Sequence, residues 1–243
     1  MLHICGWSGG KDSCASIILA KEHGIPLDKI VFSEVMYDRK NNISGEHPWH
    51  MDFMKNKAIP LFRSWGYEVV ILHADTDYLD LFHHIIDSPR AHTEHVGKKF
   101  GFPLTGLCSI KRDLKVKPMQ QYLKSLNEPY IQYLGICADE PLRLRSMEKK
   151  QNAYSILAEF GYTQEMTRAK CEEYGLLSPV YELTDRSGCW FCPFAKVEEH
   201  RELKRSAPDL WASFISLEQE SDLAYSKWNV YDTTLAERDV LLL

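Results

Sequence analysis

The sequence has no apolar run of the length that crosses a membrane, no internal repeat and no low-complexity tract. These absences exclude membrane-spanning, solenoid and disordered architectures. The first residues enter a strand-like stretch without the basic region and apolar core of a secretory signal. We therefore expect a cytoplasmic protein without a membrane partner.

The sequence also lacks an excess of basic residues. Lys and Arg total 29 and Asp and Glu total 34, so the net charge is −5 and the chain is not a general binder of polyanions. Seven cysteines cannot all pair with one another, which argues against a secreted disulfide scaffold and for free thiols or metal ligands. The remaining composition, with 44% hydrophobic and 26% charged residues, is that of an ordinary globular protein.

Strand-like and helix-like segments alternate along the first two thirds of the chain, which predicts an α/β fold with a doubly wound, mostly parallel sheet. We expect a loop over residues 88–107 and a helix over residues 147–160 that Gly161 closes. We divide the chain into a nucleotide-binding α/β domain, residues 1–161, and a helical, loop-rich C-terminal subdomain, residues 162–243. The expected strands are residues 2–7, 29–36, 67–73 and 130–138.

The strongest local motif is Ser8-Gly9-Gly10-Lys11-Asp12-Ser13, which lies between the first expected strand and the first expected helix. Open α/β sheets bind ligands at such carboxyl ends of strands. The glycines let the backbone approach a phosphate, and the N-terminus of the helix faces the anion. An ordinary capped turn is the alternative, but the complete motif favours a phosphate site. The spacing is not that of a Walker loop.

This motif resembles the PP-loop of the adenine nucleotide α-hydrolase superfamily, the ATP pyrophosphatases. Three further segments are similar to motifs of its phosphoadenosine-phosphosulfate (PAPS) reductase-like branch, and the resemblance spans roughly residues 1 to 195. These segments are Cys108-Ser109-Ile110-Lys111 with Lys117-Pro118-Met119, Leu134 to Glu140 with Arg143 and Arg145, and Gly188-Cys189-Trp190-Phe191-Cys192.

The resemblance implies an enzyme that binds ATP or a related adenine nucleotide. Carboxylates suit Mg²⁺ on a polyphosphate and arginines suit phosphate, although an acidic loop and solvated arginines are the alternatives for these residues. The candidate catalytic residues are Lys11, Asp12 and Arg143. The candidate nucleotide-binding residues are Ser8, Gly9, Gly10, Lys11, Asp12, Ser13, Asp139, Glu140 and Arg145, with Asp139 and Glu140 assigned to Mg²⁺.

The spacing Cys189-x-x-Cys192 lets two thiolates reach one metal ion. The resemblance adds Cys108 to this site. Cys171 is the best candidate for a fourth ligand and His200 a weaker one. An iron–sulfur cluster is favoured slightly over zinc because of the family, and unliganded thiols remain the third reading.

In this superfamily the usual reaction cleaves ATP at the α-phosphate to activate a substrate. We expect that chemistry here, coupled to sulfur chemistry at the cysteines, with an unknown small-molecule or nucleic-acid acceptor, and we allow for a homodimer. One alternative is a PAPS/APS reductase-like sulfonucleotide reductase, which the lack of a cysteine after Cys192 disfavours. The non-enzymatic alternative is a nucleotide-binding module with structural zinc.

Overall fold

The computed structural model describes residues 1–89, 92–103, 108–184, 187–228 and 234–240. The chain forms two compact units, each assembled from three segments. Unit 1 comprises residues 1–33, 49–72 and 119–187, and unit 2 comprises residues 34–48, 73–118 and 188–243. None of the described helices is long and apolar enough to span a bilayer.

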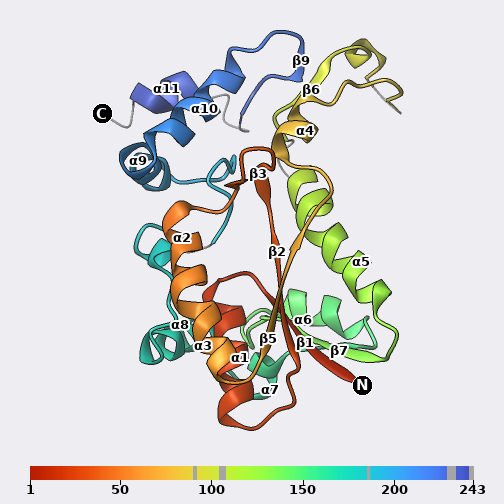
Figure 1. Ribbon diagram of the computed structural model, residues 1–243, viewed down its shortest axis with the longest axis vertical. Helices are drawn as coiled ribbons and strands as arrows, with labels where there is room; N and C mark the ends of the chain where they lie inside the picture. Colours follow the sequence, from red (N-terminus) through yellow and green to blue (C-terminus); the bar gives the residue numbers. More distant parts are fainter. Residues whose placement is uncertain (90–91, 104–107, 185–186, 229–233, 241–243) are drawn as a thin grey trace. The chain divides into compact units, whose positions relative to one another are not determined.

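A five-stranded sheet forms the centre of unit 1 (Figure 1). β1 pairs in parallel with β2 and β7, and β7 pairs in parallel with β8. This arrangement confirms the predicted α/β fold with a mostly parallel sheet. In spatial order the strands are β5 (Glu68–His73), β2 (Lys29–Glu34), β1 (Leu2–Trp7), β7 (Tyr130–Tyr133) and β8 (Ala153–Tyr154).

Side chains alternate between the two faces of the central strand β1, and helices cover both faces. Ile4 packs with Val31 and Leu123, the last from α5 (Lys117–Ser125). Cys5 and Trp7 belong to the larger core cluster on the other face. The helices of that cluster, grouped on one side in Figure 1, include α1 (Lys11–Glu22), α3 (Ile59–Ser64), α7 (Ile156–Glu159) and α8 (Gln164–Glu173).

The helix expected over residues 147–160 is wrong in part. The structure has α6 (Pro141–Glu148), then strand β8, then the short helix α7. Pairing with β7 overrides the local helical pattern, since Ala153 lies opposite Gln132 in the ladder. Ser155 fixes the new helix start, because its Oγ accepts a hydrogen bond from the Ala158 N–H at 3.1 Å.

The segment before β5 is helical, with an irregularity just before Pro60. It comprises α2 (Pro48–Phe53), the π-helical turn η1 (Met54–Ala58) and α3. Pro60 follows η1 in the first turn of α3, and it has no N–H to donate to the preceding turn of this continuous helical segment. The π-helical turn is thus the local response to the proline that the sequence marks as a kink.

Unit 2 is built from short elements around an aromatic core. The expected loop over residues 88–107 contains a short helix and strand β6, while residues 90–91 and 104–107 lie outside the described part. β6 pairs in parallel with β9, and β3 pairs antiparallel with β4. The strands are β3 (Met36–Asp38), β4 (Ile43–Ser44), β6 (Lys99–Gly101) and β9 (Leu223–Tyr225).

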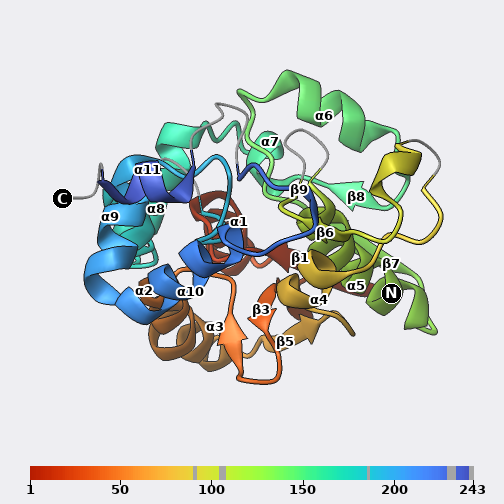
Figure 2. The ribbon, with the colours of Figure 1, turned by 90° about the horizontal axis from the view of Figure 1, so that it is seen from above.

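Helices α9, α10 and α11 lie side by side (Figure 2).

The expected boundary after residue 161 differs from the compact units, because α8 packs against α1 and belongs to unit 1. The helices of unit 2 are α4 (Tyr78–His83), α9 (Val197–Ser206), α10 (Pro208–Glu218) and α11 (Leu235–Val240). Shorter turns are η2 (Thr93–His95) and η3 (Lys111–Val116) in unit 2, and η4 (Pro179–Glu182) in unit 1.

His200 lies fully buried on α9 among aromatic rings. Its ring centroid is 5.0 Å from that of Trp211 and 5.1 Å from that of Trp228. Burial, with a smaller repulsion from Arg238, lowers the pKa of His200 from 6.5 to about 3. The folded protein therefore holds this imidazole neutral.

This burial predicts a loss of stability in acid. Between pH 6.5 and 3 the unfolded chain binds a proton that folded His200 does not. As the pH is lowered from 6.5, the free energy of unfolding should therefore fall by up to about 1.4 kcal/mol for each pH unit. The full stability is present above pH 6.5. Urea unfolding at pH 7, 6 and 5 measures this slope. His200→Phe should reduce it, and His23→Phe on the exposed end of α1 should not; equal slopes in both variants would contradict the assignment.

Candidate nucleotide site and cysteine cluster

The loop Ser8–Gly10 joins β1 to α1 and has a backbone shape that requires glycine. Gly9 has φ +71°, a left-handed conformation that residues with a Cβ rarely adopt. A Cβ at Gly9 would lie 2.6 Å from the His50 imidazole and would also collide with Met54 Sδ. The loop is therefore packed against α2 and η1 on the side where a larger residue would project.

Several N–H groups of this loop donate to hydroxyl oxygens. The Ser8 N–H donates to Ser13 Oγ at 3.2 Å, and the Gly10 N–H donates to Ser8 Oγ at 3.3 Å. The Lys11 N–H donates to Tyr181 OH at 3.0 Å. These donors converge around the N-terminus of α1, where the helix dipole also favours negative charge. The same N–H groups can donate to phosphate oxygens, because these oxygens accept hydrogen bonds as the hydroxyl oxygens do.

Lys11 and Asp12 form a buried polar network with α8. Lys11 is 8% exposed, and its Nζ lies 2.5 Å from Asp12 Oδ1 and 3.4 Å from Thr167 Oγ1. The Thr167 hydroxyl donates to the same Asp12 oxygen at 2.8 Å. Cys137 Sγ also donates to this oxygen at 3.5 Å, and burial followed by the charge of Asp12 raises the pKa of Cys137 to about 12. Asp12 is thus the shared acceptor of the network.

The segment after β7 reaches the same helix terminus. A Cβ at Gly135 would lie 2.8 Å from the Ser13 nitrogen, so the backbone passes directly over the first turn of α1. Glu140 accepts hydrogen bonds from the Cys137 N–H at 2.9 Å and from Arg143 Nη1 at 2.6 Å. Asp139 accepts a hydrogen bond from the Gln164 N–H at 3.3 Å, at the start of α8. The carboxylates of Asp139 and Glu140 therefore order this segment.

The predicted residues of unit 1 thus fall into two groups. The motif residues Ser8 to Ser13 converge at the α1 terminus, and Cys137, which precedes Asp139 and Glu140, contacts Asp12. Arg143 and Arg145 lie exposed on α6. Three contacts with residues 8–12 come from residues outside the predicted nucleotide site, namely His50, Tyr181 and Thr167. Chain folding brings these residues to the loop from distant sequence positions.

The cysteines predicted as ligands are distributed over both units. Cys171 belongs to unit 1, where its Sγ donates to the Lys11 carbonyl at 3.1 Å. A hydrogen bond with Cys14, together with burial, strongly raises the pKa of Cys171. Cys108, Cys189 and Cys192 belong to unit 2. The structure therefore gathers three of the four predicted ligands in one unit.

Cys189 lies in a charged environment. It forms a backbone bridge with Glu46, whose carboxylate accepts from Lys115 Nζ at 2.8 Å. Burial, the charge of Glu46 and the thiols Cys192 and Cys108 raise the pKa of Cys189 well above 9.0, and Lys115 opposes this effect. Cys192 and Cys108 are thus electrostatic neighbours of Cys189, whose thiol remains protonated at neutral pH.

Packing of the Gly188–Cys192 segment onto the β4 turn fixes Cys189 and Cys192. The Trp190 N–H donates to the Gly45 carbonyl at 3.0 Å, and its indole N–H donates to the Ser44 carbonyl at 2.9 Å. Thiols of this kind match the donor preference of zinc and of iron–sulfur clusters. In the part of the chain that the structure describes, however, no three His, Cys, Asp or Glu side chains are arranged to hold a metal ion.

Comparisons with known proteins give likenesses at low sequence identity. No protein-family model matches the sequence, and no curated protein matches it. One similar solved structure is the PAPS reductase from Candida auris in its phosphate complex, with 12% identity, a TM-score of 0.48, and coverage of 78% of this chain and 82% of that chain. Another is the U34-tRNA thiolase NcsA from Methanococcus maripaludis with its [4Fe-4S] cluster, with 14% identity, a TM-score of 0.41, and coverage of 100% of this chain and 72% of that chain.

The close packing of Gly9 generates a prediction with an internal control. Gly9→Ala combines a left-handed backbone with a collision against His50 and should lower the free energy of unfolding by about 2–3 kcal/mol. Gly24 has φ +63°, but a Cβ there would meet open space, so Gly24→Ala should lower the free energy of unfolding by only about 1 kcal/mol. Urea denaturation of both variants measures the difference. Equal losses would show that the contact with α2 and η1 contributes nothing.

Proposed function

We propose that the protein binds an adenine nucleotide at residues 8–13 and cleaves ATP at the α-phosphate to activate an acceptor. The observation that carries this proposal is the convergence of the Ser8, Gly10 and Lys11 N–H groups at the N-terminus of α1. The sequence resemblance to PP-loop enzymes supports it. A nucleophile of the acceptor attacks the α-phosphorus, the bond from that phosphorus to the bridging oxygen breaks, and pyrophosphate leaves with the bond electrons.

The chain supplies positioning and charge neutralisation rather than covalent chemistry. Phosphate oxygens would accept the loop N–H bonds that hydroxyls now accept. Lys11 would neutralise charge on pyrophosphate while Asp12 and Thr167 orient its ammonium group. Arg143 and Arg145 would contact phosphate from α6. Mg²⁺ bound through Asp139 and Glu140 would neutralise further charge on the polyphosphate.

The second part of the proposal is sulfur chemistry at the cysteines of unit 2. Cys108, Cys189 and Cys192 would hold an iron–sulfur cluster, with zinc as the alternative. Cys171, the predicted fourth ligand, is left out of this proposal, because its thiol donates to the Lys11 carbonyl within unit 1. Such a group would supply sulfur chemistry beside the activated acceptor, with the three thiols as its ligands. Lys115 lies beside these thiols, and Glu46 and the thiols Cys189 and Cys108 raise its pKa although burial opposes the charge. A cation held there would stabilise a thiolate or sulfide.

Loss of the Lys11 charge should abolish turnover without unfolding the protein. We expect Lys11→Ala to lower ATP-dependent pyrophosphate release about 100-fold or more, because one preorganised charge contributes about 3 kcal/mol to a phosphoryl transition state. Lys21→Ala, at the exposed end of the same helix, is the matched control. Pyrophosphate is measured with a coupled assay in the presence of cell-extract small molecules and RNA as acceptors. Tight ATP binding with no turnover would favour the nucleotide-binding module instead.

The cysteine assignment is tested by metal analysis after anaerobic purification. A brown protein with broad visible absorption and bound iron is the expected result, and Cys189→Ala should lose both the colour and the iron. Cys5→Ala, a buried thiol of unit 1, should retain them. Cys171→Ala should also retain them, because this thiol is hydrogen-bonded within unit 1. A colourless protein with stoichiometric zinc would overturn the cluster, and a metal-free protein would overturn the site.

A further inference from the structure

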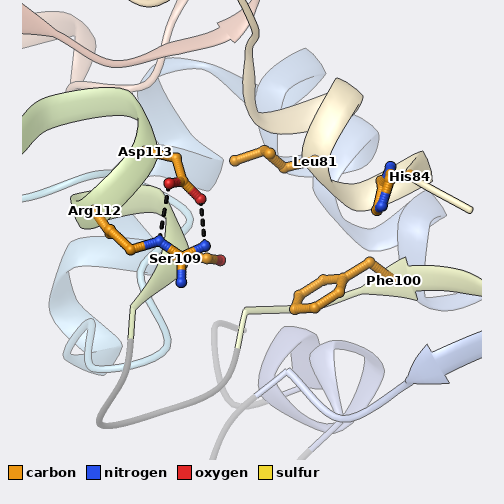
Figure 3. Close-up of a pocket in the computed structure, with 6 residues that line it drawn as sticks. All are labelled: Leu81, His84, Phe100, Ser109, Arg112 and Asp113. Carbon is orange, nitrogen blue, oxygen red and sulfur yellow. Dashed lines mark hydrogen bonds and ion pairs between the residues drawn. The ribbon is translucent and has the colours of Figure 1, made fainter. Parts of the chain in front are cut away.

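Unit 2 contains a cavity of about 270 Å³ that is lined in part by Ser109, the residue after Cys108 (Figure 3). Leu81 and His84 line it from α4 and the residue after that helix, and Phe100 lines it from β6. The other walls come from the helical segment that follows Cys108. These other residues are Ser109, Arg112 and Asp113. None of these side chains has a role in the proposed nucleotide site.

Arg112 and Asp113 of the cavity are paired with each other. Arg112 Nε and Nη2 donate to the two oxygens of Asp113 at 2.9 and 2.6 Å, as the dashed lines of Figure 3 show. This hydrogen bond lowers the pKa of Asp113 and commits one edge of the guanidinium. The flat face of the guanidinium remains available for stacking, a contact that arginine makes readily with aromatic rings. The pair carries no net charge, so the cavity does not select an ion.

The remaining walls are also flat or apolar. The Phe100 N–H donates to the His84 carbonyl at 2.8 Å, which holds the phenyl and imidazole side chains at the same cavity. Tyr225 packs on Phe100 with ring centroids 5.1 Å apart and so fixes the phenyl orientation from behind. A cavity with ring, guanidinium and Leu81 walls fits a planar, largely uncharged ring better than an extended or charged ligand.

A second cavity of the same volume shares part of this wall. It is lined by His84 and Phe100 together with Tyr225 and His95, and its volume is also about 270 Å³. Two cavities of similar volume that share the His84 and Phe100 side chains suit two successive rings. Stacking of neighbouring bases on aromatic side chains is the usual way in which proteins hold unpaired nucleic-acid bases.

The cavity is adjacent to a cysteine of the proposed sulfur site. Ser109 follows Cys108 directly, and the Lys111 N–H donates to Cys108 Sγ at 3.4 Å. Arg112 and the Cys108 carbonyl are joined by a backbone hydrogen bond of 3.1 Å. A ligand in the cavity therefore contacts the same turn of chain that positions this thiol.

We propose that this cavity binds a nucleobase, the heteroaromatic ring of the acceptor, next to Cys108. The inference deepens the proposed function, on which its role in the reaction rests, by naming the class of acceptor. The base could belong to a free nucleoside or to a single strand, and the second cavity favours the strand.

The test is calorimetric binding to the full chain without ATP, using uridine, cytidine and a pyrimidine single-stranded oligonucleotide. Pyrimidines avoid the adenine site. Phe100→Ala should weaken binding at least tenfold, because stacking of one base accounts for that range. Phe100→Trp should retain binding. Phe160→Ala is the matched control, since Phe160 is 37% exposed in unit 1 and packs on His23.

Phe100→Leu keeps an apolar side chain without a ring and replaces Phe100→Ala if that variant unfolds. If the oligonucleotide binds more tightly than the nucleosides, and Tyr225→Ala weakens its binding as well, the ligand is a single strand. If the nucleosides bind as tightly as the oligonucleotide, the ligand is a free base. No binding of any pyrimidine ligand, or binding unchanged within twofold in both Phe100 variants, overturns the inference. Pyrophosphate release by the unaltered protein is measured separately, so failure of the cavity and failure of the nucleotide site give different results.

Discussion

The nucleotide site depends on the interactions of the Asp12 carboxylate, which is partly buried. It stands in the first turn of α1 and accepts hydrogen bonds from Lys11, Thr167 and Cys137. These partners come from α1 itself, from α8 and from the segment after β7. Pairing stabilises a partly buried negative charge, so these hydrogen bonds hold the three segments together at the helix terminus. The position of Lys11 is a consequence of this pairing rather than of the loop alone.

Local chemistry made the fold and the phosphate loop predictable from sequence. The period of apolar residues located β1, α1 and β2, and glycine at positions 9 and 10 marked the sharp turn between them. The edge strand β8 was missed because two residues are too few to carry a period, and its pairing with β7 is a long-range event. Likewise, Tyr181 reaches the Lys11 N–H from 170 positions away, a contact that no local pattern encodes.

The cysteines show the same division between local and long-range information. The spacing of Cys189 and Cys192 identified a pair of thiols on one turn, and the structure brings Cys108 into their electrostatic neighbourhood. Cys171 was chosen for its polar helix, but its thiol faces the Lys11 carbonyl and Cys14. Composition thus identified candidate ligands, whereas the grouping of these ligands required the fold.

The interleaving of the two units has a consequence for synthesis of the protein. The chain passes from one unit to the other at residues 33–34, 48–49, 72–73, 118–119 and 187–188. Unit 1 therefore cannot close until residue 187 has left the ribosome, since α8 and Tyr181 complete the loop that begins at residue 8. Contacts between residues so far apart in sequence form slowly, because a long loop must close, at a cost in chain entropy, before the contacts can stabilise it. A fragment ending at residue 161 would carry the entire phosphate-binding motif and still lack the hydroxyl groups of Thr167 and Tyr181 that order it.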